Sequence, residues 1–243
     1  MKGGDYMYWK HILSFFRIIK KPKDIPRVNM LNTTESIDII ENAVYAELKP
    51  LGFRKFGRTL HRFVDGDISQ VINFQCGQSY RDETHLMWVN IGIRVPECEL
   101  RRFEPEEKLK KYYHEYNCNM RSRLGKTKGK NVTTYNLHGS IDEITADILE
   151  QIKEYVLPAF DVLKDRESIL EKRREYRNFD TLHYNTILLQ EAMIYGRMGD
   201  LDKASELFNL YYLKCKKRIN PNKGHLDVLE KLADELKITL KDS

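Results

Sequence analysis

The chain has 243 residues, of which 41% are hydrophobic and 32% are charged, and this composition is typical of a folded globular protein. A chain of this length buries on the order of 70% of its unfolded surface, so it needs no disulfide or metal ion for stability. No run approaches the roughly 18 consecutive apolar residues of a membrane-spanning helix, which excludes that class of membrane protein.

The net charge of +5 resides at the N-terminus. Residues 1–30 hold seven Lys or Arg and two Asp, an excess of five that equals the net charge of the whole chain. The rest of the chain is therefore neutral, and it lacks the basic body that is typical of nucleic-acid-binding proteins.

Residues 1–29 form a basic segment in which Arg17 interrupts the apolar run from Tyr6 to Ile19. A signal peptide requires an unbroken apolar core, so the segment predicts none. The interpretations left open are a helix on an anionic membrane surface, a helix docked on the body, a disordered segment, or a stretch upstream of a true start at Met30. Four widely spaced cysteines favour reduced thiols, and together these features predict a cytoplasmic protein.

The body begins with a helix and a β-hairpin. Asn32 and Glu35 form a capping-box sequence, which predicts a helix from there to Pro50. The Asp65–Gly66 pair predicts a two-residue type I′ turn between strands at 59–64 and 67–76. That turn pairs Val64 with Asp67, and His61 with Gln70 in the core. It places Phe63, Ile68, Ile72 and Phe74 on an apolar face, and Arg62, Ser69, Asn73 and Gln75 on the other.

A third strand is predicted at residues 86–95, where apolar and polar residues alternate. Met87, Val89, Ile91 and Ile93 share one side, and Trp88, Asn90, Gly92 and Arg94 share the other. Pro105 begins a helix with the buried stripe Leu109, Tyr112, Tyr113 and Tyr116. Two short strands follow at 119–124 and 132–137. These elements predict an α+β fold with an antiparallel sheet of about five strands packed on helices.

The C-terminal part is predicted to be helical. Ser140 and Glu143 begin a long helix that Pro158 should kink or break. The helical pattern then continues from about Glu167 to the end, with interruptions near Asn178, Gly199 and residues 220–224. We therefore predict an α+β domain at 30–165 and an all-helical extension at 166–243.

Three sequence blocks carry a family resemblance: LKPLGFRKFGRTLHRFVDGDISQVINFQ at 48–75, VNIGIRVPE at 89–97 and NMRSRLG at 119–125. In this order they resemble the bacterial family catalogued as domain of unknown function 4304, over roughly residues 30–137. The resemblance implies a shared fold. It carries no catalytic residue, because that family has no established activity.

A second resemblance lies near residues 185–215. Small, aromatic and turn residues stand there at the positions of one tetratricopeptide-type helical hairpin, although Lys216 replaces the usual final proline. A single repeat must stack on neighbouring helices. Plain helix packing and a peptide-binding groove are both open. The matching residues are Ala192, Tyr195, Gly199, Ala204 and Phe208.

No motif predicts catalysis, a cofactor or a metal. The segment 125–130 fails the phosphate-loop spacing by one residue, and Asn131 replaces the hydroxyl that would hold magnesium. His114 and Cys118 imitate a zinc-protease helix without its second histidine. What remains at 125–130 is a basic loop that is either solvated or a weak anion contact through Lys126, Lys128 and Lys130.

The strongest candidate site is the polar face of the sheet. Asn and Gln are poor strand formers, and Trp and Arg dominate binding surfaces. A solvated face, or one covered by a C-terminal helix, is the alternative. The clustered arginines favour an acidic or carboxylate-bearing partner. The candidate residues are Arg62, Asn73, Gln75, Trp88, Asn90, Arg94, Arg121 and Arg123.

We therefore predict a non-enzymatic binding module without a cofactor, for a protein partner, through this face or the C-terminal helices. Nucleic-acid or other polyanion binding through the arginines and the basic loop is the first alternative. An enzyme with an unrecognised site is the second.

Overall fold

The computed structural model describes residues 32–77, 85–99, 115–179 and 186–241. Within these residues the strands form one antiparallel sheet in the order β1–β2–β3–β4–β5, and β6 pairs with β4 beside β5. The predicted α+β fold is confirmed. The strands are β1 Arg54–Phe56, β2 Thr59–Val64, β3 Ile68–Cys76, β4 Leu86–Arg94, β5 Met120–Arg123 and β6 Tyr135–Asn136.

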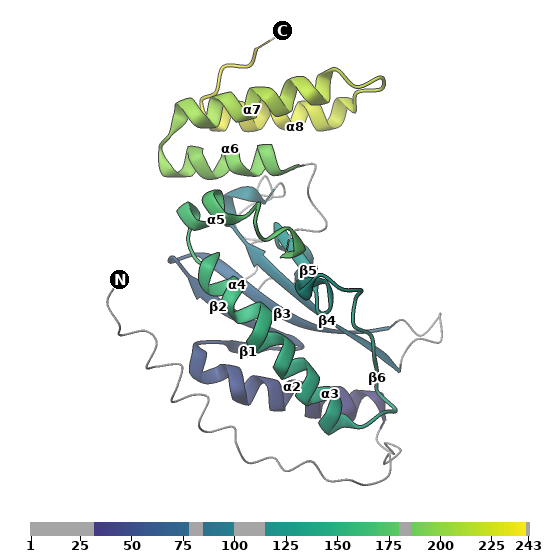
Figure 1. The fold of residues 1–243 in the computed structure, drawn as a ribbon. Coiled ribbons are helices and arrows are strands. Elements are labelled where there is room, and N and C mark those ends of the chain that lie inside the picture. The colour runs from purple at the N-terminus through teal and green to yellow at the C-terminus, as the bar shows by residue number, and fades with distance from the viewer. Residues whose placement is uncertain (1–31, 78–84, 100–114, 180–185, 242–243) are drawn as a thin grey trace, which may run out of the picture.

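Helices α2 and α3–α4 lie on one face of the sheet (Figure 1). Helix α2, Thr33–Leu48, begins at the predicted capping box, in which the Asn32 side chain accepts a hydrogen bond from the Glu35 backbone. Helix α3, Ile141–Gln151, runs into the π-helical turn Ile152–Val156 and then into α4, Leu157–Val162. The π-helical turn accommodates Pro158, so the helix is perturbed there and continues.

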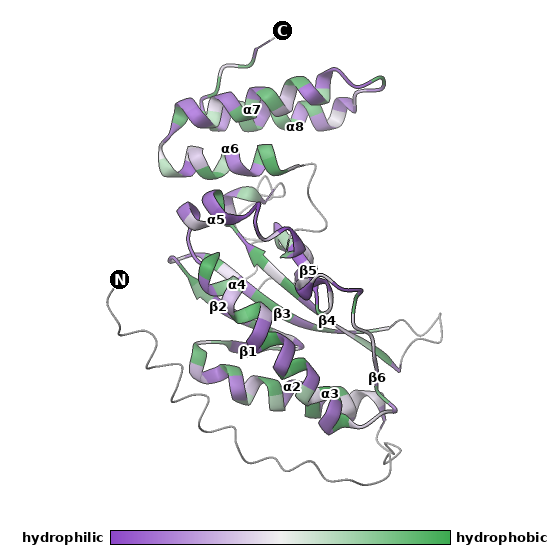
Figure 2. Cartoon of the chain, in the orientation of Figure 1, coloured by the Kyte–Doolittle hydropathy of each residue, from purple (hydrophilic) through white to green (hydrophobic). Residues whose placement is uncertain are grey.

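The core lies between these helices and the sheet. Figure 2 shows hydrophobic and hydrophilic residues alternating along α2 and α3, as expected for helices with one buried face. Seven of the strand residues predicted to face the core are buried, and each buried hydrophobic side chain contributes about 1.5–3 kcal/mol. They are Ile68, Ile72, Phe74, Met87, Val89, Ile91 and Ile93.

The β2–β3 hairpin differs from its prediction by one residue. Its loop has three residues, Asp65, Gly66 and Asp67, and the first two adopt the positive φ angles of 47° and 77°. Val64 therefore pairs with Ile68, and the predicted pairing with Asp67 is wrong. Because side chains alternate along a strand, this shift exchanges the two faces of β2 relative to β3.

Every β2 side chain changes face relative to β3 as a result, and three of these changes correct a prediction. Phe63, predicted in the core, is 43% exposed on the opposite face. His61 pairs with Val71 instead of Gln70. Arg62 pairs with Gln70 on the face that the helices cover.

The C-terminal helices stack at one end of the sheet (Figure 1). Helices α6 and α7 form a hairpin around Gly199, which has a φ of 89°, and α6 also contacts the 3₁₀ turn Pro96–Cys98 after β4. Buried residues before and after residue 165 form one hydrophobic cluster, so the predicted division into domains stays a prediction. The helices are α5 Arg166–Lys172, α6 Ile187–Met198, α7 Leu201–Lys216 and α8 Lys223–Glu235.

Some predictions fall outside the described residues. These include the basic segment 1–29 and most of the helix expected to begin at Pro105. Tyr116, expected in that helix's buried stripe, is 51% exposed. The likeness of α6 and α7 to a tetratricopeptide hairpin stays a prediction, because two packed helices occur in many folds. No helix of the described residues is long and apolar enough to cross a membrane.

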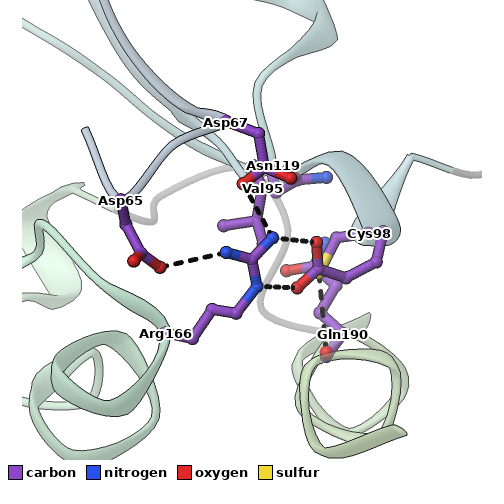
Figure 3. A network of polar contacts seen from close by, with 8 residues as sticks. Asp65, Asp67, Val95, Cys98, Asn119, Arg166 and Gln190 are labelled. Carbon is purple, nitrogen blue, oxygen red and sulfur yellow. Dashed lines mark hydrogen bonds and ion pairs between the residues drawn. The ribbon is translucent and has the colours of Figure 1, made fainter. Parts of the chain in front are cut away.

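Arg166 joins the start of α5 to the sheet (Figure 3). Its Nε and Nη2 atoms donate to the two Glu97 carboxylate oxygens at 2.7 and 2.9 Å. Its Nη1 and Nη2 atoms also donate to Asp65 at 3.0 Å and to Asp67 at 2.9 Å. The three-residue hairpin loop thus presents both of its carboxylates to one guanidinium.

Replacing this arginine tests the ion-pair cluster. Arg166→Met is expected to lower the free energy of unfolding by about 3 kcal/mol, because it removes both Arg166 hydrogen bonds from the buried Glu97 carboxylate. Urea denaturation measures the loss. Adding Glu97→Gln should restore part of it, because an amide carries no charge to bury. An equal loss in the single and double variants would contradict this account.

Glu41 of α2 is a buried carboxylate beside β1 and is 1% exposed. Burial raises the pKa of Glu41 above its ordinary value, and the neighbouring Lys55 and Arg58 only partly oppose this effect. Lys55 Nζ lies 3.7 Å and Arg58 Nε lies 4.0 Å from the carboxylate oxygens. The folded protein therefore holds the Glu41 proton more tightly than the unfolded chain does.

This raised pKa gives the stability a pH dependence of known sign. The contribution of Glu41 is most favourable below its unfolded-state pKa, and it is lost as the pH rises through the folded-state pKa. Glu41→Gln removes this pH-dependent loss of stability, because glutamine does not ionise. The free energy of unfolding of the variant relative to wild type is expected to be more favourable at pH 7 than at pH 4, measured by urea denaturation. An identical difference at both pH values would show that burial of the charge is not costly.

Candidate binding surface

A row of side chains crosses the sheet on the face opposite to α2 and α3–α4. The Cα pairings align one residue from each strand from β1 to β5, and residues opposite each other on neighbouring strands project from the same face. The four members of this set on β2 to β5 are polar, and we call these four residues the polar row. The aligned residues are Phe56, Thr59, Asn73, Asn90 and Arg123.

Hydrogen bonds link the polar row from end to end. Arg123 Nε donates to Asn90 Oδ1 at 2.8 Å, and Asn90 Nδ2 donates to Asn73 Oδ1 at 3.1 Å. Asn73 Nδ2 then donates to Thr59 Oγ1 at 2.9 Å. Each amide both donates and accepts, which explains how Asn90 tolerates an exposure of only 3% in the middle of the sheet.

The polar row ends in an arginine with a fixed orientation. Gln75 Oε1 accepts from Arg123 Nη2 at 3.3 Å and from Asn90 Nδ2 at 2.9 Å. The Arg123 guanidinium carbon lies 5.7 Å from the centre of the Trp88 ring, and Trp88 Nε1 donates to Thr134 Oγ1 at 3.0 Å. Contacts on several sides therefore hold the half-buried guanidinium, so little side-chain entropy remains to be lost when it binds a ligand.

A hollow of about 420 Å³ opens beside Arg123, a volume within the range of small-ligand sites. Among its described lining residues are three cations and one acid, Glu115, whose Oε1 accepts from Arg121 Nη2 at 3.1 Å. The excess of positive charge favours an anionic ligand. The lining residues are Asn90, Glu115, Arg121, Ser122, Arg123, Lys126 and Val132.

A second, shallower hollow adjoins the first and shares Lys126 and Val132 with it. The basic loop after β5 forms this second hollow, and Figure 2 shows that segment as hydrophilic. Its other described lining residues are Lys128, Gly129, Lys130, Asn131 and Thr133.

The basic loop is built around Gly125, which has a φ of 85°. A side chain at this position would collide with the carbonyl oxygen of Asn131. The Gly125 N–H donates to Gln151 Oε1 of α3 at 2.9 Å, and its carbonyl accepts from the backbones of Lys128 and Lys130. The loop therefore has a defined shape, in which Thr127 is buried while Lys126 and Lys130 are exposed.

The structure brings together five of the eight predicted surface residues: Asn73, Gln75, Trp88, Asn90 and Arg123. Arg121 projects from the same face of β5 and lines the first hollow. Thr59, Thr134 and Glu115 were missed. The correct hairpin register would have found Thr59, because it aligns with Asn73.

Two predicted residues lie elsewhere. Arg94 lies on the same face of the sheet, but at the opposite end of the strands. It is 5% exposed there, and its guanidinium pairs with Glu99 at 2.8 Å. Arg62 was placed wrongly, because the three-residue loop turns it to the helix-covered face. There it donates to Asp161 at 2.9 Å and to Gln70 at 2.6 Å, and it lies over the Phe53 ring.

Among the described residues, no group of three or more His, Cys, Asp or Glu side chains is placed to hold a metal ion. Cys118 is fully buried, and burial raises its pKa far above the ordinary range of a thiol. Its thiol is therefore uncharged at neutral pH.

Comparison with known proteins identifies a family without assigning an activity. No curated protein and no solved structure matches the chain significantly. Residues 44–162 match the sequence model of the family described as Domain of unknown function (DUF4304), and this region includes the whole polar row and both hollows. Through residues 44–162, the chain belongs to the DUF4304 family.

Proposed function

We propose that this chain is a binding module for a protein partner, which docks at the accessible end of the polar row, on Arg123 and the neighbouring Trp88. The observation that carries this proposal is the fixed orientation of Arg123 at the edge of an open, basic hollow. Arginine and tryptophan contribute disproportionately to protein interfaces, and a side chain that is already ordered loses less entropy on binding.

The network of the polar row also argues for function over stability alone. Apolar residues in the same positions would make the sheet at least as stable, because buried polar groups need complete hydrogen bonding merely to offset desolvation. The network instead fixes one cation at the surface. Positioning of that kind serves recognition, in which the direction of a hydrogen bond selects the ligand.

The proposal is tested by affinity capture with the full chain as bait, from the cells that produce it, followed by mass spectrometry. Arg123→Ala and Trp88→Ala are each expected to reduce recovery of the partner at least tenfold, because interface hot spots contribute about 2 kcal/mol or more. Arg123→Lys keeps the charge but loses the planar fork, so it should give an intermediate recovery.

Arg197→Ala is the matched control, because it removes the same charge from an exposed position on α6, outside both hollows. Circular dichroism confirms that each variant is folded. Equal recovery with wild type, Arg123→Ala and Trp88→Ala would refute the proposed surface and direct attention to the C-terminal helices.

A further inference from the structure

We infer that the partner presents an acidic peptide segment, and that this segment lies along the two adjoining hollows. This inference rests on the proposed function and specifies the chemistry of the partner. We call the joined surface the basic trough. Its cations are Arg121, Arg123, Lys126, Lys128 and Lys130, and its acid is Glu115.

The two hollows of the trough adjoin, because Lys126 and Val132 line both. Arg121 and Arg123 stand in the first hollow, and Lys128 and Lys130 stand in the second. The chain after residue 30 is neutral overall. Five cations beside one acid are therefore a local concentration of charge on this surface, and they suit a ligand with several anionic groups in sequence.

Arg123 is the anchor of the trough. A guanidinium has five N–H donors. In Arg123, Nε donates one of them to Asn90 and Nη2 donates one to Gln75. The other donors can serve a carboxylate at the edge of the first hollow. Lys126, exposed between the hollows, and Lys130, at the far end of the loop, supply point charges for further carboxylates.

The absence of an aromatic stacking surface among the described lining residues favours a peptide over nucleic acid. Single-stranded nucleic acids gain much of their affinity by stacking bases on aromatic rings. None of the described residues lining the trough is aromatic. Trp88 lies outside that lining, Arg123 covers one face of its ring, and its Nε1 donates to Thr134.

The test is fluorescence anisotropy with the full chain and two labelled probes of equal charge, an oligoglutamate peptide and an oligothymidylate. The peptide is expected to bind more tightly, with an affinity that falls as salt rises. Arg123→Ala and Lys126→Glu should each weaken peptide binding about tenfold or more, because a charge-assisted hydrogen bond or close ion pair is lost.

Charge reversal at an exposed site gives the matched control. Arg197→Glu changes the net charge as much as Lys126→Glu does, but it lies outside the trough. The N-terminal segment is also basic, so only a loss specific to Arg123 and Lys126 assigns binding to the trough. Lys126 is exposed, and its substitution does not threaten the fold should Arg123→Ala prove unstable.

Three outcomes would overturn the inference. Tighter binding of the oligothymidylate would make the trough a nucleic-acid site. Equal losses in Lys126→Glu and Arg197→Glu would show that only net charge matters. Failure of the peptide to bind, while capture of a protein still depends on Arg123, would reject the acidic segment and leave the proposed function standing.

Discussion

The register of β2 against β3 is the constraint on which the rest of the molecule depends. The three-residue loop Asp65–Asp67 sets this register by pairing Val64 with Ile68. Thr59 consequently stands beside Asn73, which completes the polar row, and Arg62 turns under α4, where its pairing with Asp161 fastens helix to sheet. The same loop geometry directs Asp65 and Asp67 to Arg166. The conformation of this loop thus determines which residues lie on the candidate binding surface, which lie in the core, and which carboxylates contact Arg166.

The polar row shows how a sheet can hold a charged group in a defined orientation. An amide in the centre of a sheet is costly unless each of its donors and acceptors is used. The row meets this condition because the Asn amides alternate donor and acceptor from strand to strand, and Arg123 supplies the terminal donor. A shift of any one strand would interrupt the chain of bonds. The orientation of Arg123 is therefore as well defined as the sheet itself.

Much of the fold was predictable, because its signals are local. The capping sequences at Asn32 and Ser140 marked true helix starts, and the alternation along β4 identified its buried side. The hairpin register was not predictable from its own residues. An Asp-Gly pair usually forms a two-residue turn, and the Arg166 side chain that binds both loop carboxylates comes about a hundred residues later.

Most residues of the candidate surface were also predictable from local signals. Asn73, Gln75, Trp88 and Asn90 follow from strand alternation, and Arg121 and Arg123 follow from their spacing on β5. Arg62 was misplaced because its side depended on the register. The shape of the basic loop depends on Gln151, a residue of a distant helix, and local sequence carries no trace of that contact.

The Arg166 cluster also couples residues that lie far apart in the sequence. Four positions from three segments, 65, 67, 97 and 166, share a single set of ion pairs. Loss of the guanidinium leaves several carboxylates close together, and loss of the acids leaves a desolvated cation. Substitutions at the four positions therefore have non-additive effects on the free energy of unfolding, because each one changes the charge balance around the other three.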